Sequence, residues 1–319
     1  MKHPFFTISI DFELFWGMRD VISIKEYGKN IIGGRKAIPR ILKLFEQKNI
    51  HATWAVVGFI SFSNKEELID YLPKSFPEYL NQKLNPYSDL KKIGLCEKED
   101  PYHYGYSLVK KIIDTHGMEI ASHSFSHFYC KEDNKNKNSF RDDLIASKKS
   151  LNRLGVDPKT YIFCRNQYED KHLKILKENG FKVFRGNEKN IIFNPMANKF
   201  FRLIRLIDSF INITGSNFSK IHISNGLINV PASRFLRPAS KFKTEKFKVT
   251  RILNNMTKAA KNKTGFHLWW HPHNFGQNQD QNFKNLEKII NHFETLKDSY
   301  DMKSLNMLEA SQLLTISND

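Results

Sequence analysis

The 319-residue sequence predicts an α/β fold in which mainly parallel strands alternate with helices. Short β-rich runs recur along the chain, separated by stretches whose apolar residues have helical spacing. The length suits one large domain or two small ones, and an α/β barrel of this size is ordinary. The repeated alternation therefore favours a single barrel-like domain over residues 1–319.

The first elements establish this alternation. The run PFFTISIDFELFW at residues 4–16 is β-rich, and HATWAVVG at residues 51–58 is a short β-like run closed by Gly58. Between them, residues 33–50 place apolar side chains at positions 38, 41, 42 and 45, which is helical spacing. A strand, a helix and a second strand in this order open a parallel sheet.

The later elements continue the pattern, apart from one interruption. Residues 61–105 contain four prolines and several tyrosines, which predicts an inserted cap or loop region. We expect further strands at 118–123, 160–164, 181–186 and within 263–276, and further helices at 106–115, 139–154, 170–179 and 281–297.

Composition narrows the class of protein. No stretch reaches the roughly 18 consecutive apolar residues of a membrane-spanning helix. The start does not have the pattern of a secretory signal, so a cytoplasmic location is the expectation. Cys96, Cys130 and Cys164 are odd in number, far apart and outside any Cys-x-x-Cys pair, which predicts reduced thiols rather than a disulfide framework or a structural zinc site.

The positive charge is concentrated in one part of the chain. Residues 189–263 hold 15 Lys or Arg against two acidic residues, a local sum of +13 out of +17 for the whole sequence. No recognised nucleic-acid-binding module is present, so nucleic acid is not an expected partner. Residues 200–213 have an amphipathic pattern, which is typical of a helix packed on its own domain but also suits peripheral contact with an anionic membrane.

Polar residues of catalytic type follow several predicted strands, where the carboxyl ends of parallel strands collect functional groups. Asp11 and Glu13 follow the first strand, and His123 and His127 follow the strand at 118–123. Two histidines four apart on a helical turn, with one carboxylate, would make a three-ligand zinc site with room for water. The alternative is that the histidines cap or cover the surface and that the carboxylates cap a helix or bind a basic side chain. Later strands add further candidates, namely Arg165, His271 and His273.

These residues lie in motifs that resemble those of the metal-dependent polysaccharide deacetylases, the NodB-type carbohydrate esterases, which have a distorted (β/α) barrel. The motifs are SIDFE, ATWAVVG, GMEIASHSFSH and WWHPHN, and the resemblance spans residues 7–276. The third of these is the most specific: Glu119 and Ile120, two small residues, and then His123, Ser124 and His127 fill the family's pattern.

The resemblance implies roles for the two histidines and the two carboxylates. By this resemblance His123 and His127 are metal ligands, Glu13 is the third ligand and Asp11 is the general base. The family's common form has two adjacent aspartates, whereas here Phe12 separates Asp11 from Glu13, so an exchange of their roles stays open. The resemblance also gives Arg165 the task of orienting the base, although the prolines that usually follow this arginine are absent.

The last motif implies a general acid. His271 follows LWW directly and fits the acid better than His273, which we expect to bind substrate or steady His271. Among the tryptophans, we expect Trp16 in a substrate groove, and Trp54 and one of the 269–270 pair in the core. The stretch NVPASRFLRP brings Arg234 and Arg237 toward the same rim as candidate substrate ligands, with a structural loop as the alternative.

The expected function is therefore a cytoplasmic, metal-dependent hydrolase, most simply a zinc enzyme, that removes an acetyl or formyl group from an amino sugar during surface polysaccharide or lipopolysaccharide assembly. The basic segment suggests that this sugar is linked to a nucleotide or lipid diphosphate. Two alternatives stay open: an amidohydrolase of the same fold acting on a non-sugar amide, and a non-catalytic glycan or nucleic-acid binder.

Overall fold

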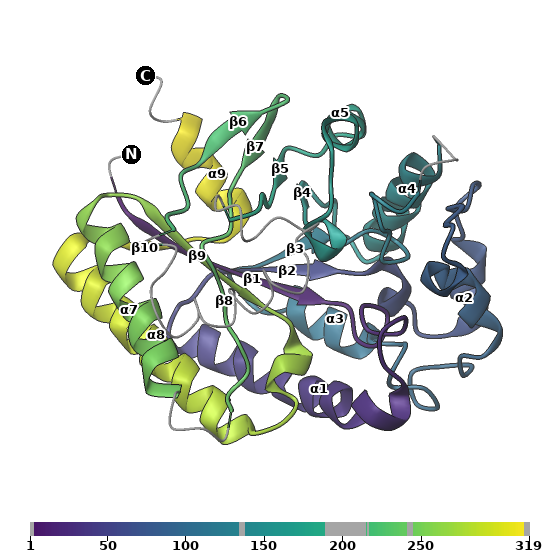
Figure 1. Cartoon of the computed structure of the whole chain (residues 1–319), viewed down its shortest axis with the longest axis horizontal. Helices are drawn as coiled ribbons and strands as arrows, with labels where there is room; N and C mark the ends of the chain where they lie inside the picture. The colour runs from purple at the N-terminus through teal and green to yellow at the C-terminus, as the bar shows by residue number, and fades with distance from the viewer. Residues whose placement is uncertain (1–2, 134–137, 189–214, 216, 241–244, 316–319) are drawn as a thin grey trace.

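The computed structural model describes residues 3–133, 138–188, 215, 217–240 and 245–315. These residues form a mixed α/β structure around a ten-stranded, largely parallel sheet that curls into a half-barrel (Figure 1). The α/β class and the distorted-barrel architecture expected from the sequence are confirmed.

The strands follow the order β6-β7-β5-β4-β3-β2-β1-β9-β8, and β10 pairs with β1 outside this path. Neighbours are parallel except for β6 and β7, which form an antiparallel pair. The strands are β1 (Phe5–Phe12), β2 (Ala52–Val56), β3 (Met118–Ser122), β4 (Thr160–Tyr161), β5 (Val183–Phe184), β6 (His222–Ser224), β7 (Leu227–Asn229), β8 (Arg234–Phe235), β9 (Gly265–Trp270) and β10 (Lys303–Ser304).

The helices cover the sheet and connect its strands. In Figure 1, α1 and the adjacent pair of α7 and α8 flank β1 and β9, while α4 and α5 lie beside the other arm of the sheet. They are α1 (Ile24–Gln47), α2 (Lys65–Asp70), α3 (Tyr106–Ile113), α4 (Ser139–Asn152), α5 (Asp170–Glu178), α7 (Glu245–Lys261), α8 (Gln279–Tyr300) and α9 (Met307–Thr315).

The first helix begins nine residues earlier than the apolar spacing predicts, at Ile24. A capping box fixes its start: the Ser23 hydroxyl accepts a hydrogen bond from the Glu26 N–H at 3.3 Å, and the Glu26 carboxylate accepts one from the Ser23 N–H at 3.2 Å. The first turns also place Ile24, Tyr27 and Ile31 at helical spacing against the core, a continuation of the periodicity that the prediction from residue 33 left out.

β1 is the strand that positions the site. It runs parallel between β2 and β9, with Ile10 opposite Trp54 on one side and Trp270 on the other. All eight residues of β1 are buried, as expected of a parallel strand covered on both faces. The carboxyl ends of these three strands therefore meet at one edge of the sheet.

The interrupting region at residues 61–105 contains α2 and two short 3-10 helices, η2 (Gln82–Leu84) and η3 (Pro86–Lys91). It packs onto the loops after β1 and β3. The hydroxyl of Tyr79 accepts a hydrogen bond from the N–H of Tyr129 at 3.0 Å, and the indole of Trp16 donates to the carbonyl of His103 at 2.9 Å. Its role as a cap stays a prediction, as does the description of the chain as a single catalytic domain.

Among the described helices, none is both long enough and apolar enough to cross a membrane. The expected amphipathic segment at 200–213 lies outside the described residues, together with much of the first half of the basic segment. The described part of that segment includes α7, which has Lys258 and Lys261 in its last turn.

Glycines allow α1 to lie directly against η6, the 3-10 helix Pro272–Phe275 that follows β9. A Cβ added at Gly33 would lie 1.9 Å from the carbonyl oxygen of Gly276, and one at Gly34 would lie 2.8 Å from the backbone nitrogen of His273. Because these neighbours are backbone atoms, they cannot rotate away. α1 thereby supports the segment that carries the last histidine motif.

We therefore expect Gly33→Ala to destabilise the protein by about 1–3 kcal/mol through overpacking. At an ordinary helix position the same change would stabilise by roughly 1 kcal/mol. Urea unfolding measures the difference, with Lys36→Ala on the exposed face of α1 as a control expected within about 0.5 kcal/mol of wild type. A Gly33→Ala protein as stable as wild type would show that the backbone at Gly276 can shift without loss of unfolding free energy.

Candidate active site

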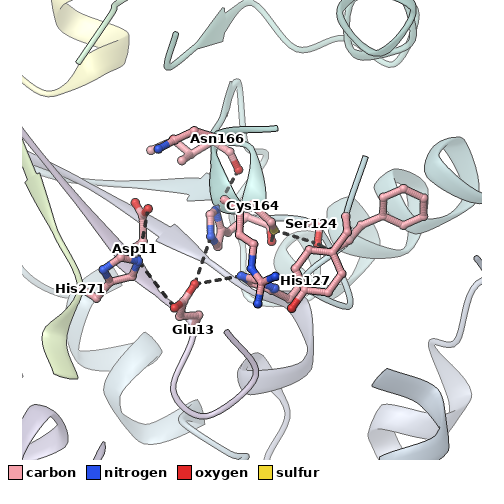
Figure 2. A network of polar contacts seen from close by, with 12 residues as sticks. Asp11, Glu13, Ser124, His127, Cys164, Asn166 and His271 are labelled. Atoms are coloured by element: carbon pink, nitrogen blue, oxygen red, sulfur yellow. Dashed lines mark hydrogen bonds and ion pairs between the residues drawn. The ribbon is translucent and has the colours of Figure 1, made fainter. Parts of the chain in front are cut away.

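Two carboxylates at the carboxyl end of β1 lie in the middle of a buried polar network (Figure 2). Asp11 and Glu13 are 3% and 4% exposed, and Phe12 between them packs in the core. Residues two apart on an extended chain point to the same face. The single-residue spacing therefore brings both carboxylates to one side.

His123 and His127 follow β3 on an irregular loop rather than on the helical turn that the sequence suggested. The N–H of His123 donates to the carbonyl of Val56 at 2.9 Å, which ties the start of the loop to β2. Ser124 and His127 have left-handed φ values of 61° and 60°, uncommon for residues other than glycine. These two turns of the backbone bring both imidazoles to the carboxylate of Glu13.

Asp143 of α4 holds this loop in place. Its carboxylate accepts hydrogen bonds from the N–H of Phe125 at 2.8 Å and from the N–H and hydroxyl of Ser126 at 3.1 and 2.6 Å. Burial raises the pKa of Asp143 to about 7, although these hydrogen bonds act in the opposite direction. The positions of the two histidines thus depend on a helix that contributes no group to the site itself.

The donor atoms of Glu13, His123 and His127 converge. Oε2 of Glu13 lies 3.0 Å from Nε2 of His127 and 3.4 Å from Nε2 of His123. Donors bound at about 2.0–2.1 Å around a tetrahedral ion are about 3.3–3.4 Å apart, so these residues fit a divalent metal. Nδ1 of His123 donates to the carbonyl of Ile162 at 2.8 Å, an arrangement typical of metal-ligating histidines.

Cys164 lies beside the same two histidines, and the sequence did not predict it as a donor. Ligand atoms of His123, His127 and Cys164 all lie within 4.8 Å of one another, and the three side chains are buried. Burial raises the pKa of the Cys164 thiol, but the two histidines lower it more, to about 6. The three side chains form a group that could hold a metal ion.

Glu13 is ionised at neutral pH in spite of its burial. Burial alone would raise the pKa of its carboxyl, but the charges of His271 and His127 and hydrogen bonds from His123 and His127 hold it well below its usual range. The site therefore contains a fixed negative charge among imidazoles.

Asp11 is paired with Arg185. The two guanidinium Nη atoms donate to the two carboxylate oxygens, each at 2.7 Å, and further hydrogen bonds reach Ser9 at 2.9 Å and Asn166 at 3.1 Å. The Arg185 side chain is 1% exposed and lies 4.5 Å over the ring of Trp269. Burial would raise the pKa of Asp11, but Arg185 and the neighbouring histidines lower it below its ordinary value.

Arg165 does not make the contact that the sequence analysis expected of it. It pairs with Asp20 at 2.7 and 2.6 Å and lies 4.5 Å over the ring of Tyr129, and the arginine that pairs with Asp11 is Arg185. The sequence held a signal for this residue, because Arg185 lies next to the end of the predicted strand at 181–186 and so reaches the same rim.

His271 faces the two carboxylates. Its Nε2 lies 3.6 Å from Glu13 and 3.9 Å from Asp11, and its side chain is 21% exposed. His273 is buried and stacks on His271 with ring centroids 4.7 Å apart. Burial and the charge of His271 lower the pKa of His273 to about 3, so it stays neutral. Of its two expected roles, this position supports steadying His271 rather than contacting substrate.

The prediction for Trp16 is wrong. The sequence placed it in a substrate groove, but it is fully buried and packs edge-to-face against Phe59 and His103. Its ring is covered by the region at 61–105, so it cannot present a face to a sugar. Trp54 and Trp270 are core residues, as expected.

Arg234 and Arg237 line a small cavity against α7, together with Glu245 and Lys248. Arg234 is 6% exposed, and its neighbour Phe235 instead contacts His271, at 5.9 Å between ring centroids. The structure thus places Arg234 away from the open side of the rim, while Arg237 is half-buried.

Arg185→Met should leave a buried, unpaired carboxylate, at a cost of about 3–5 kcal/mol in unfolding free energy. Because the pKa of Asp11 is lowered in the folded protein, the pair stabilises above the ordinary aspartate pKa of 3.8, and this contribution is lost as the pH falls through the lowered value. Urea unfolding should show the gap between wild type and variant narrowing in acid. Arg165→Met, which breaks a more exposed pair, should cost less; equal losses or a gap independent of pH would contradict this account.

Comparisons with known proteins agree with the motifs. The family model described as polysaccharide deacetylase matches residues 30–184, a range that includes His123, His127 and Cys164 but excludes Asp11, Arg185 and His271. No curated protein matches the chain.

Several solved structures share the fold. One is assigned as a polysaccharide deacetylase from Mycobacterium smegmatis, with 13% identity and a TM-score of 0.63, covering 99% of this chain and 92% of that chain. Another, assigned in the same way, is from Pseudomonas aeruginosa PAO1, with 10% identity and a TM-score of 0.59, covering 97% and 89%. The PuuE allantoinase has 11% identity and a TM-score of 0.54, covering 97% and 88%.

At these identities the solved structures establish the fold alone, and the family match supplies the relationship in sequence. The resemblance to the polysaccharide deacetylase family, predicted from the motifs, is confirmed over residues 30–184, the part of the chain that the family model matches.

Proposed function

We propose that this protein is a metal-dependent N-deacylase that hydrolyses the amide of an acetylated or formylated amino sugar. One observation carries the proposal: the carboxylate of Glu13 lies 3.0–3.4 Å from the imidazoles of His123 and His127, beside a second carboxylate and the partly exposed His271. A glycan-binding protein has no need for ligand, base and acid candidates at one buried point.

Glu13, His123 and His127 would hold the metal, for which zinc is the simplest candidate. When bound, such an ion lowers the pKa of water and polarises a carbonyl oxygen. The contacts favour one of the two role assignments that the sequence left open. Glu13 faces both histidines, whereas Asp11 faces Arg185, which supports Glu13 as the ligand and Asp11 as the base.

Proton transfer is the task of the remaining residues. Asp11, kept ionised by Arg185, takes the proton of the attacking water through the lone pairs that the arginine leaves unused. His271 gives a proton to the departing amine, which is a poor leaving group unless protonated. His273 beneath it stays neutral, so the two stacked rings do not compete for a proton. Each transfer contributes roughly 10² to 10⁴ in rate.

The proposed substrate is an amino sugar linked to a nucleotide or lipid diphosphate. We place the reaction in the cytoplasm, during surface-glycan assembly. Peripheral contact with an anionic membrane through residues 200–213 is a further part of the proposal. The uneven positive charge of residues 189–263 supports it. Hydrolysis of a non-sugar amide is the second candidate, since an allantoinase shares the fold. A screen of N-acyl sugars and cyclic or linear amides for product release distinguishes the two.

Separate variants should divide the site into ligands and proton-transfer groups. His123→Ala and His127→Ala should abolish stoichiometric zinc because each removes a donor. Asp11→Asn and His271→Ala should keep zinc but lose roughly 10² to 10⁴ in turnover. Elemental analysis and release of acetate or formate measure the two properties.

Two results would reverse individual roles in this scheme. If Asp11→Asn strips the metal while Glu13→Gln retains it, the carboxylates exchange functions. If His273→Ala impairs turnover more than His271→Ala, the acid is His273.

If the substrate carries phosphate, its negative charge should make kcat/KM depend on ionic strength. For a diphosphate-linked N-acyl sugar, kcat/KM should fall as ionic strength rises and fall again in Arg237→Ala, because salt and neutralisation both weaken attraction to the anion. A free N-acyl sugar should show little of either response, and Lys36→Ala, outside the basic segment, serves as the matched control. Equal processing of free and phosphate-linked sugars at low salt would argue against this substrate class.

A further inference from the structure

Cys164 occupies a position that its sequence neighbours do not explain. It begins the 3-10 helix η4 (Cys164–Asn166) just beyond the end of β4 and is 1% exposed. Its thiol donates to the carbonyl of His123 at 3.3 Å and lies 3.6 Å from the hydroxyl of Ser124. Both contacts are with the loop that carries His123 and His127, and Figure 2 shows the one between Cys164 and Ser124.

Two observations point from this thiol to a metal. The first is the cluster itself, in which ligand atoms of Cys164, His123 and His127 lie within 4.8 Å of one another. The second is the position of the thiol, which contacts the carbonyl of His123 and the hydroxyl of Ser124 and so lies against the loop that presents both imidazoles. Two imidazoles and a thiol gathered at one buried point are a donor set that suits zinc.

The other two cysteines have no such surroundings. Cys130 is equally buried, but it lies in an apolar cluster with Phe128, Phe140 and Phe163. Cys96 is half-buried in the region at 61–105. The contrast separates Cys164 from an ordinary core cysteine.

We propose that Cys164 is an additional protein ligand of the metal, so that the site offers two imidazoles, a carboxylate and a thiolate. The proposal rests on the proposed metal-dependent function and adds a residue to it. Two anionic donors, Glu13 and Cys164, balance the charge of a divalent ion in a buried site. Zinc sites expand to five donors during catalysis, so a fourth protein donor leaves access for substrate.

The chemical consequence is metal selection. Thiolates are soft ligands that suit zinc, whereas carboxylate and carbonyl oxygens suit magnesium and manganese. Cys164 thus favours zinc and its analogue cobalt. The preference would be weaker with Glu13 and the histidines alone.

Cobalt substitution tests the proposal without reference to activity. The full chain loaded with one equivalent of Co²⁺ should show the near-ultraviolet thiolate-to-cobalt charge-transfer absorption. Cys130→Ser should retain this band, and Cys164→Ser should lose it while still binding one cobalt. Competition titrations should show zinc affinity at least about tenfold weaker in Cys164→Ser, with a smaller change for manganese.

A second variant keeps the test decisive if Cys164→Ser does not fold. In Cys96→Ser/Cys130→Ser, the remaining thiol is Cys164, and the charge-transfer band must persist. Stoichiometric cobalt without this band in wild type or in the double variant overturns the role of Cys164 and leaves the Glu13, His123 and His127 site standing. Failure to bind cobalt at all overturns the metal centre, and with it both the proposed function and this inference.

Discussion

The parallel pairing of β1 with β2 on one side and β9 on the other is the constraint on which the site depends. Parallel strands end at the same edge, so groups that are distant in sequence arrive together. Asp11 and Glu13 come from the first of these strands and His271 from the last, while His123 starts a loop that is tied to β2 through Val56. Without this register the carboxylates would still be present, but they would face no histidine.

Such a gathering of charge inside a protein is tolerated only when the charges are paired. Arg185 neutralises Asp11 with two hydrogen bonds, and the imidazoles do the same for Glu13. The backbone contributes as well, because the loop after β3 contains two residues in left-handed conformations and is anchored by Asp143. The interactions that make the burial of the two carboxylates possible are therefore the same ones that hold them in place for chemistry.

Much of this arrangement follows from the sequence because strand endings and the spacing of His123 and His127 are local signals. What the sequence could not supply were contacts between segments far apart. Arg185 was missed because its role had been given to Arg165, an arginine beyond the neighbouring strand. Trp16 was misplaced because the region that covers it has no periodicity from which its packing can be read. Cys164 became visible as a donor only when the loop after β3 was placed against it.

The strand order also dictates when the site can exist. β1 precedes its neighbours β9 and β10 in the chain by more than 250 residues. Until residues 265–270 leave the ribosome, one edge of β1 has backbone groups without a partner, and such edges are prone to pair with other chains. Contacts of this sequence separation form late because the intervening chain must first be ordered. β1, which holds Asp11 and leads into Glu13, is thus synthesised well before the strands that complete its pairing.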